Sequence, residues 1–152
     1  MSAYYLAKDI MSTPTAIIVA EHGSAFGPFV SMARSGGRDV LVVEQSSVES
    51  ASELARRVRE TLEELEQSGA ALRGAILVGG GRTDESVLSA RSSMVRTLIG
   101  PMVHADEGEM VLVSSGRDRF SMQGLAAVTA EMLRGANVRV RSASADAGVK
   151  AA

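Results

Sequence analysis

The sequence has no cysteine and no tryptophan, and aromatic residues make up only 3% of its 152 positions. Without cysteine there is no disulfide framework, thiolate zinc site or cysteine nucleophile. Scarce aromatic residues argue against the stacking platforms of single-strand nucleic-acid binders and against aromatic cages. The chain has only 2 histidines, which excludes a histidine-rich metal site. We therefore predict that the protein uses no metal and no cofactor.

The sequence also lacks a strong charge imbalance and a long apolar run. Its formal net charge of −2 gives no general attraction to nucleic acid or to anionic membranes, so neither is an expected partner. A run of about 18 apolar residues, the minimum for a membrane span, occurs nowhere. The N-terminus has only Lys8 as a basic residue and does not resemble a signal peptide. We expect a cytoplasmic protein.

The length suits one domain with one core, which we place at residues 14–142. Residues 1–13 mix apolar and polar types without a clear period and are followed by Pro14. They are interpreted as an N-terminal arm that either packs on a neighbour or stays loose. Residues 143–152 are mostly small and have no apolar periodicity, and we expect them to form a disordered tail.

Apolar patterns predict alternating strands and helices over most of the chain. Short runs rich in β-branched residues predict strands at 15–20, 39–44, 72–78, 109–114 and 138–141. Helical spacing predicts three helices: one from Ser46 to Gly69 with a Ser46–Glu49 capping box, one from about Glu85 that stops before Pro101, and one closed by Gly135. The last strand carries alternating arginines, which is typical of a sheet edge.

Residues 24–38 are open to two interpretations. Residues 29–34 alternate like a strand, and Ser35-Gly36-Gly37-Arg38 is typical of a hairpin turn, which favours an antiparallel hairpin with residues 39–44. We then expect a single mixed α/β sheet in the order β-β-β-α-β-α-β-α-β, with helices mainly on one face. The alternative is a short helix that begins at Pro28 and is capped by Gly36. That helix would give an all-parallel, five-stranded, flavodoxin-like sheet.

A glycine-rich turn after the strand at 72–78 is the main candidate site. Glycines allow close backbone approach, the arginine could pair with an anion, and the threonine or aspartate can cap the next helix. A plain tight turn is the alternative. The turn, which we predict to bind a ligand or partner, consists of Gly79, Gly80, Gly81, Arg82, Thr83 and Asp84.

Two further residues belong to this candidate surface. Arg91 lies one helical turn from Val87, at the edge of the apolar stripe of the following helix. It is either a ligand or partner arginine or an arginine whose stem packs on the core while its charge reaches water. Ser86 lies near the N-terminus of this helix, where the helix dipole tolerates negative charge, so it is a candidate for phosphorylation.

No assembled catalytic set is visible. The turn is neither a Walker loop nor a Gly-x-Gly-x-x-Gly fingerprint, and the sequence contains no Gly-x-Ser-x-Gly elbow. An enzyme would require four scattered residues to converge from the ends of strands, and scattered surface acids are the simpler interpretation. These four residues are Glu21, His22, Glu44 and Asp84. We therefore predict that the protein is not an enzyme.

The turn Gly81-Arg82-Thr83-Asp84 resembles one found in an uncharacterised group of bacterial proteins related to the STAS fold, the fold of anti-sigma-factor antagonists. That group has an opening β-hairpin, a Ser-capped helix and a strand that ends in a Gly-Arg-Asn-Asp type turn. The element order is similar from about Pro14 to Arg141. Two features differ: Leu77-Val78-Gly79 stands where that group tends to carry an acidic residue and an arginine, and the Asp-Ser-x-Gly pattern of true antagonists is missing.

The resemblance implies a non-catalytic interaction domain. We accordingly predict a regulatory or scaffold module that binds a protein partner and self-associates as a homo-oligomer. The alternative function is a sensor domain that binds a small anion or a nucleotide at the Gly79–Asp84 turn.

Overall fold

Five parallel strands form one sheet in the computed structural model, which describes residues 14–145. The order of the strands across the sheet is β2-β1-β3-β4-β5, and every neighbouring pair is parallel. The strands are β1 (Thr15–Ala20), β2 (Asp39–Glu44), β3 (Leu72–Val78), β4 (Gly108–Ser114) and β5 (Val138–Ser144). The α/β class is thus confirmed, and so is the all-parallel, flavodoxin-like alternative.

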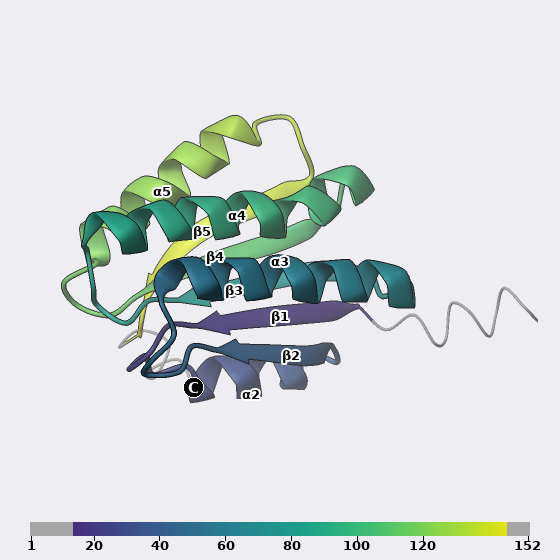
Figure 1. Cartoon of the computed structure of the whole chain (residues 1–152). Helices are drawn as coiled ribbons and strands as arrows, with labels where there is room; N and C mark the ends of the chain where they lie inside the picture. Colours follow the sequence, from purple (N-terminus) through teal and green to yellow (C-terminus); the bar gives the residue numbers. More distant parts are fainter. Residues whose placement is uncertain (1–13, 146–152) are drawn as a thin grey trace, which may run out of the picture.

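Within the described part of the chain, four helices connect these strands. They are α2 (Gly27–Ser35), α3 (Ala51–Ser68), α4 (Glu85–Ala105) and α5 (Arg119–Met132). Figure 1 shows α3, α4 and α5 on the same side of the sheet, with α2 on the other side beside β2. The expectation that helices gather mainly on one face is confirmed for these residues.

The predicted opening hairpin is wrong, because residues 27–35 form α2 and β2 runs parallel to β1. Phe29 is buried, and Val30 and Ala33 pack beside it against the sheet, which is the spacing of one helix face. Phe29 and Ala33 are four residues apart, a spacing that one face of a strand also allows, so the local pattern could not separate the two structures. Helix α2 has proline in its first turn and Gly36 as its C-cap, as the alternative predicts.

The first long helix begins later than predicted. Its capping box uses Ser50 and Glu53, whereas Ser46 and Glu49 form a separate turn before it. The helix ends at Gly69, whose φ of 77° is in the left-handed region that glycine favours. The capping-box pattern occurs twice within eight residues, and only the second pair directly precedes the apolar stripe that packs on the sheet.

Helix α4 does not stop before Pro101, as the sequence predicts, but continues to Ala105. A proline inside a helix costs one backbone hydrogen bond and crowds the preceding turn. Here Met102, directly after the proline, is fully buried in the main core. Its packing holds the final turn in place, and Pro101 itself lies exposed on the surface of the helix.

Two apolar layers hold the sheet. The main core lies between the sheet and α3, α4 and α5, and it contains fully buried side chains such as Ile17, Leu77 and Leu112. The smaller core lies on the opposite face, where Phe29 of α2 packs with Ile18. Strands buried on both faces have the continuous apolar sequences that this chain shows.

The last strand extends the domain slightly beyond its predicted end. Strand β5 is an edge strand, as predicted, but it extends through Ser144, two residues beyond the expected domain boundary. The predicted arm at 1–13 and most of the predicted tail lie outside the described residues. Among residues 14–145, no helix is both long and apolar enough to cross a membrane.

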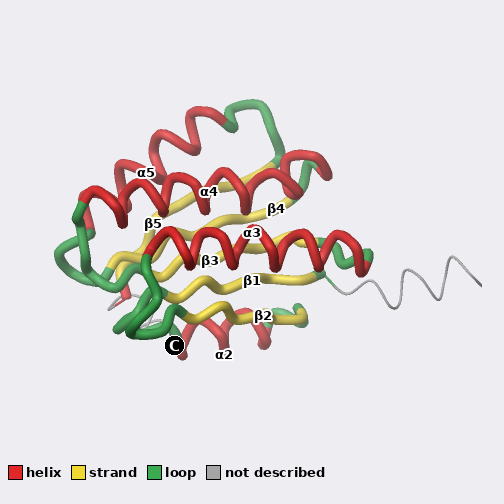
Figure 2. The backbone as a smooth tube through the Cα atoms, in the orientation of Figure 1, coloured by secondary structure: helices red, strands yellow, loops and turns green. Residues whose placement is uncertain are grey.

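Figure 2 shows the loops that follow the strands gathered at one edge of the sheet. This is the carboxyl edge, because all five strands run in the same direction. The opposite, amino edge holds the starts of the strands and the C-terminal ends of α3 and α4. Hollows lie at both edges of the sheet.

Candidate functional site

The candidate site lies at the carboxyl edge, between β1 and β3. Ala20 and Val78, the last residues of these two strands, are paired across the sheet, so Glu21 and Gly79 leave it at the same level. From there the chain turns to opposite faces, since β1 leads to α2 and β3 leads to α4. Parallel α/β sheets commonly bind ligands at such a switch point, where neighbouring loops separate.

A buried arginine joins the loop after β1 to α4. Arg91 Nε donates a hydrogen bond to Glu21 Oε2 at 2.6 Å, and Arg91 Nη2 donates to Glu21 Oε1 at 2.7 Å. The two side chains therefore form a bidentate ion pair, and they are only 1% and 7% exposed. Arg91 is thus not the exposed arginine that a partner-binding role would require.

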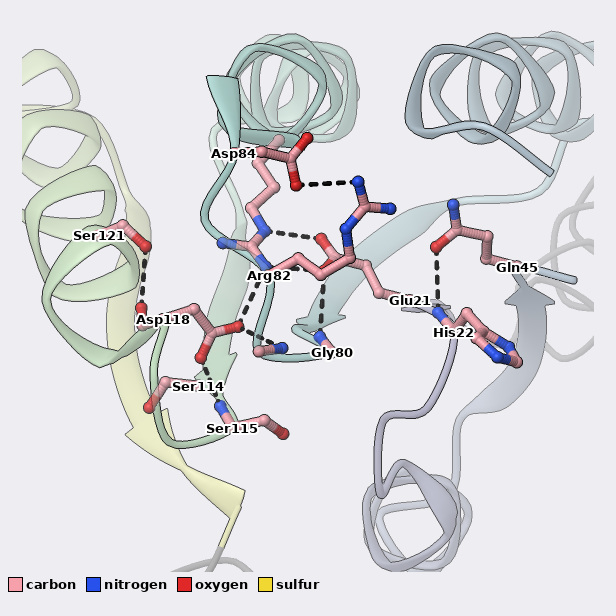
Figure 3. Close-up of polar contacts among 12 residues, drawn as sticks. Glu21, His22, Gln45, Gly80, Arg82, Asp84, Ser114, Ser115, Asp118 and Ser121 are labelled. Atoms are coloured by element: carbon pink, nitrogen blue, oxygen red, sulfur yellow. Dashed lines mark hydrogen bonds and ion pairs between the residues drawn. The ribbon is translucent and has the colours of Figure 1, made fainter. Parts of the chain in front are cut away.

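Asp118, in the loop after β4, completes the cluster. Its Oδ2 accepts from Arg91 Nη2 at 3.0 Å, and its Oδ1 accepts from the Ser115 backbone N–H at 2.6 Å. The Asp118 side chain is fully buried. Figure 3 shows Glu21 and Asp118 approaching this point from different strands. We call Glu21, Arg91 and Asp118 the arginine cluster.

The arginine cluster has two negative charges and one positive charge. Burial alone would lower the pKa of Arg91, but the hydrogen bond and charge of Glu21, together with Asp118, outweigh this effect and raise the pKa. The arginine is therefore charged at every physiological pH. Backbone N–H groups from two loops, those of Gly80, Gly81 and Ser115, stabilise the remaining negative charge.

The first half of the predicted turn is occupied by the protein's own groups. Gly79 N–H donates to Val113 O at 2.8 Å, Gly80 N–H donates to Glu21 Oε1 at 3.0 Å, and Gly81 N–H donates to Asp118 Oδ2 at 3.0 Å. Two of these three acceptors are carboxylates of the same chain, those of Glu21 and Asp118. These N–H groups are not free to hold an external phosphate.

Glycine is required in this half because neighbouring atoms lie too close for a side chain. A Cβ on Gly79 would come within 2.2 Å of Asp118 Oδ2, and one on Gly80 within 2.4 Å of the His22 carbonyl oxygen. Gly81 has a φ of 91°, in the left-handed region. The three glycines therefore serve close packing around the arginine cluster.

The second half of the turn is exposed. Arg82 Nη2 lies 2.9 Å from Asp84 Oδ1, and the two side chains are 65% and 43% exposed. The Ser86 hydroxyl donates to Asp84 Oδ2 at 2.5 Å. This hydrogen bond, followed by the charge of Arg82, lowers the pKa of Asp84. Thr83 and Ser86 are also exposed, so phosphorylation of Ser86 stays a prediction.

A pocket of about 270 Å³ lies beside the turn, between the carboxyl end of β1 and the first turns of α3 and α4. Apolar side chains form its floor, and polar groups surround its mouth. The floor consists of Ala51, Leu54, Val87, Ala90 and Met94. The polar lining consists of Glu21, His22, Gln45, Ser46, Ser47, Glu49, Gly80 and Arg82.

Hydrogen bonds fix one wall of this pocket. Gln45 Oε1 accepts from the His22 backbone N–H at 3.0 Å, and Gln45 Nε2 donates to Glu49 O at 2.9 Å. Figure 3 shows Gln45 bridging toward His22. Arg57 donates two hydrogen bonds to the Glu49 carboxylate, at 3.0 and 2.7 Å, and the pKa of Glu49 is lowered mainly by this contact.

Two carboxylates of the pocket are therefore already neutralised by arginines of the chain, Glu21 by Arg91 and Glu49 by Arg57. Arg82, at the mouth of the pocket, differs from them, because its only ion-pair partner, Asp84, is itself exposed. The pocket can thus donate hydrogen bonds to a ligand mainly through Arg82, His22 and the hydroxyls of Ser46 and Ser47, and Arg82 also supplies positive charge. This set favours a small anion.

The residues that an enzyme would need do not assemble into a catalytic set. Glu21 and His22 line the pocket, but the Glu21 carboxylate is held by Arg91 and by a backbone N–H. Glu44 and Asp84 do not line it. Within residues 14–145, no three histidine or acidic side chains lie close enough together to hold a metal ion.

Sequence reasoning missed the role of Asp118 and assigned the wrong environment to Arg91. Asp118 stood in a polar turn and gave no signal of burial. The partners of Arg91 lie 70 and 27 residues away in the sequence. One signal was present: an acid directly after the first strand and an arginine on the inner side of a helix can meet at the carboxyl edge of a parallel sheet.

Comparison with known proteins places the fold but not the family. No protein-family model matches the chain, and no curated protein matches it by sequence. A short-chain dehydrogenase from Rhodopseudomonas palustris is similar in structure, with a TM-score of 0.56 at 12% identity over 86% of this chain and 84% of that one. A Pseudomonas syringae protein described as a short chain dehydrogenase has a TM-score of 0.56 at 16% identity over 86% and 76%.

A ribose-5-phosphate isomerase from Brucella melitensis 16M has a TM-score of 0.51 at 15% identity, over 88% of this chain and 69% of that one. At these identities the likeness concerns the fold alone. The chain therefore shares a parallel α/β fold that enzymes use. The STAS-related proteins have an opening β-hairpin, whereas this chain has helix α2 at that place. The resemblance of the Gly81–Asp84 turn to theirs stays a prediction.

Proposed function

We propose that this chain is a non-catalytic sensor domain that binds a small anionic molecule in the pocket between β1 and β3. The observation that carries this proposal is the combination of an apolar floor with one exposed arginine at the mouth of a switch-point pocket. Ligand sites are commonly apolar hollows with a few convergent polar groups. The first turn of α3, through Ala51, adds the positive end of a helix dipole.

The size of the pocket limits the ligand. Drug-sized molecules occupy sites of about 300–1,000 Å³, whereas this pocket measures about 270 Å³. A small carboxylate or phosphate ester suits it better than a dinucleotide. The loop after β1 agrees, because it lacks the Gly-x-Gly-x-x-Gly sequence and α2 has a proline, which has no N–H, in its first turn.

A non-catalytic role is supported by the state of the acids. Glu21 and Asp118 are buried and each is hydrogen-bonded to Arg91 and to backbone N–H groups. Neither is available to accept a proton from a substrate without breaking the arginine cluster. The remaining acid of the pocket, Glu49, is held by Arg57.

A thermal-shift screen against small carboxylates, phosphate esters, mononucleotides and divalent metals tests this proposal. A ligand at a hundredfold excess over its dissociation constant should stabilise the fold by about 2.7 kcal/mol. Arg82→Gln should abolish the shift. Arg134→Gln is the matched control, because Arg134 is an exposed arginine paired with Glu131 on α5, far from the pocket in sequence.

Two results would contradict the proposal. One is the absence of any saturable shift across these ligand classes. The other is a shift that survives Arg82→Gln unchanged, because the anion would then bind elsewhere. A divalent metal that alone stabilised the protein would point instead to a metal-dependent function.

The second candidate is the self-associating interaction module. A strip of exposed apolar side chains favours it: Val103 on α4 and Val128 and Met132 on α5 are 40%, 61% and 65% exposed. A groove of about 230 Å³ between these helices also includes Ile99 and Arg96. Exposed apolar strips of this kind mark contact surfaces in many proteins. We propose a second copy of the chain as the partner.

Sedimentation of the purified protein over a range of concentrations tests this second candidate. Val128→Lys should convert an oligomer into a monomer, because the lysine charge would be buried in the contact. Val48→Lys is the matched control, since Val48 is 91% exposed in the loop before α3. A wild-type protein that stays monomeric throughout would contradict self-association.

A further inference from the structure

The outer face of α5 differs in polarity from the outer face of α3. Helix α5 lies next to α4, over β4 and β5 (Figure 1). Its exposed residues include only two charged ones, Arg119 and Glu131, and Phe120, Val128 and Met132 are exposed beside them. The exposed residues of α3 include six charged ones: Arg56, Arg59, Glu60, Glu63, Glu64 and Glu66. A charged outer face suits contact with water, whereas the face of α5 suits contact with another apolar surface.

Phe120 is the aromatic residue of this face. Its side chain is 83% exposed, in the first turn of α5. The two other phenylalanines, Phe26 and Phe29, belong to the smaller core or pack against it. Burial of an aromatic side chain removes about 150–250 Å² from water and is strongly favourable. Phe120 therefore has much to gain from a contact outside the described chain.

One turn after Phe120, a glycine occupies the exposed middle of the same helix. Gly124 has no positive φ, and a Cβ on it would meet no atom within 4 Å. Nothing in the described part of the chain therefore requires glycine here, although glycine destabilises a helix relative to alanine. The distance between two packed helices depends on the side chains at their contact. A missing side chain on this face allows a second helix to come close.

The groove of about 230 Å³ between α4 and α5 lies beside this face. Its apolar lining includes Ile99, Val128 and Met132. It is smaller than the sites of about 300–1,000 Å³ that hold drug-sized molecules, so a single side chain suits it better. Phe120 does not line the groove of its own chain. The side chain that could fill the groove must therefore come from another molecule.

Two copies fill each other's groove when their α5 helices lie antiparallel. Phe120 and Met132 are twelve residues apart, about 18 Å along a helix, and Gly124 and Val128 lie symmetrically between them. In an antiparallel pair with twofold symmetry, Phe120 of each copy faces Met132 of the other, and Val128 faces Gly124. A branched side chain then meets the space left by a glycine. The aromatic ring meets a thioether sulfur, which is a favourable contact.

Charge favours the same arrangement. The N-terminal end of each α5, with Arg117 and Arg119, comes toward the C-terminal end of the other. Glu131 lies at that end and is paired only with the exposed Arg134. Among residues 14–145, Arg96 of the groove has no ion-pair partner. Its guanidinium is free to lie against the aromatic ring that enters the groove.

We infer that the chain forms a twofold dimer in which α5 packs antiparallel on α5 of a second copy, and Phe120 of each copy fills the groove of the other. This inference rests on the self-association proposed above and names the residues that meet. The contact uses the same surface on both copies, so it closes at two subunits. The groove shares no lining residue with the pocket between β1 and β3, which stays open in both subunits.

Sedimentation of the purified protein over a range of concentrations tests the role of Phe120. Phe120→Ser should raise the dissociation constant of the dimer at least tenfold, because the groove loses its occupant. Val48→Ser is the matched control, since Val48 is 91% exposed in the loop before α3. A dimer that Phe120→Ser leaves unchanged would overturn this inference and leave self-association standing. A wild type that stays monomeric throughout would overturn both.

The absence of cysteine allows a direct test of the orientation. Phe120→Cys and Met132→Cys are oxidised with copper-phenanthroline, each alone and as a mixture. In the antiparallel dimer, cysteines of unlike variants are adjacent, whereas those of like variants are about 18 Å apart along the helices. A disulfide requires Cα atoms within about 7 Å of each other. The mixture should therefore give several-fold more covalent dimer than either variant alone. Equal or stronger cross-linking within one variant would overturn the antiparallel arrangement.

Discussion

The turn between β3 and α4 has two halves that differ in nearly every physical respect. In the buried half, Gly79–Gly81, each N–H is bonded to the protein, and the nearest charges are locked in the arginine cluster. In the exposed half, Arg82–Asp84, an ion pair lies in water and meets the mouth of the pocket. The first half fixes the loops in place, and the second half is free to meet a ligand.

This difference teaches that a glycine-rich turn after a parallel strand need not be a phosphate cradle. Its backbone donors can be consumed by acids from neighbouring loops. The recognition function then moves to the adjacent side chains, here Arg82 and the serines across the pocket. The predictions below test this division of roles.

Arg91→Met should have the largest effect. It leaves Glu21 and Asp118 buried without their cation, and breaking a buried pair in this way costs about 3–5 kcal/mol. Urea denaturation measures the loss in the free energy of unfolding. Arg96→Met, an exposed arginine on the same helix, should change this value by less than about 0.5 kcal/mol. Equal losses in the free energy of unfolding for the two variants would contradict a special structural role of the arginine cluster, and with it the distinction between the two halves of the turn.

Gly80→Ala should have the next largest effect. The new methyl group would meet the His22 carbonyl oxygen at 2.4 Å, and backbone cannot move aside as a flexible side chain can. Overpacking of this kind costs about 1–3 kcal/mol. Gly124→Ala in α5 should instead stabilise the protein by about 0.5–1 kcal/mol, since alanine favours a helix. Thermal denaturation of both variants gives the comparison.

The Glu49–Arg57 pair at the rim of the pocket should show an intermediate, pH-dependent effect. The pKa of Glu49 is lowered in the folded state, so the pair stabilises the protein above the ordinary glutamate pKa of about 4.3. This stability is lost as the pH falls through the lowered folded-state pKa. Because Arg57 is 43% exposed, the effect should not exceed about 1 kcal/mol.

Unfolding of the wild type and Arg57→Gln at several pH values measures this effect. The difference between the two proteins should be constant near neutral pH and should vanish in acid. A difference that grew as the pH fell would show that the sign of the Glu49 shift is wrong.

Arg82→Gln should have the smallest effect on stability and the largest on binding. An exposed ion pair contributes about 0.2–1 kcal/mol at most, so the free energy of unfolding should barely change. The thermal shift produced by a small anion should nevertheless disappear. Calorimetric titration of a ligand from the screen distinguishes the two quantities. A large loss of stability would mean that the exposed half is structural as well.

Much of the fold could be predicted from the sequence, because long periodic segments specify their own structure. The helix at 51–68 and the strand at 72–78 are of this kind. Residues 27–35 could not be assigned, because the four-residue spacing of Phe29 and Ala33 fits one face of a helix and one face of a strand. The predicted end of α4 was wrong because the burial of Met102 outweighs the cost of Pro101 inside the helix. That burial depends on packing against residues distant in the sequence.

The candidate site could be located but not interpreted from the sequence. The Gly79–Asp84 turn was correctly placed between β3 and α4, since a strand, glycines and a helix follow one another there. The N–H groups of this turn donate hydrogen bonds to Glu21 and Asp118, and these two acids come from other loops. Only the order of the strands brings these acids to the turn.

The arginine cluster also decides how this edge of the protein opens. The amides of Gly80, Gly81 and Ser115 donate to its two carboxylates, although they belong to two different loops. If either loop moved away, a buried carboxylate would be exposed, and the hydrogen bonds that the other loop makes to the cluster would be weakened. These three amide hydrogens should therefore exchange with solvent at one common rate, as a single cooperative unit, while the neighbouring amides of Arg82 and Thr83 exchange freely.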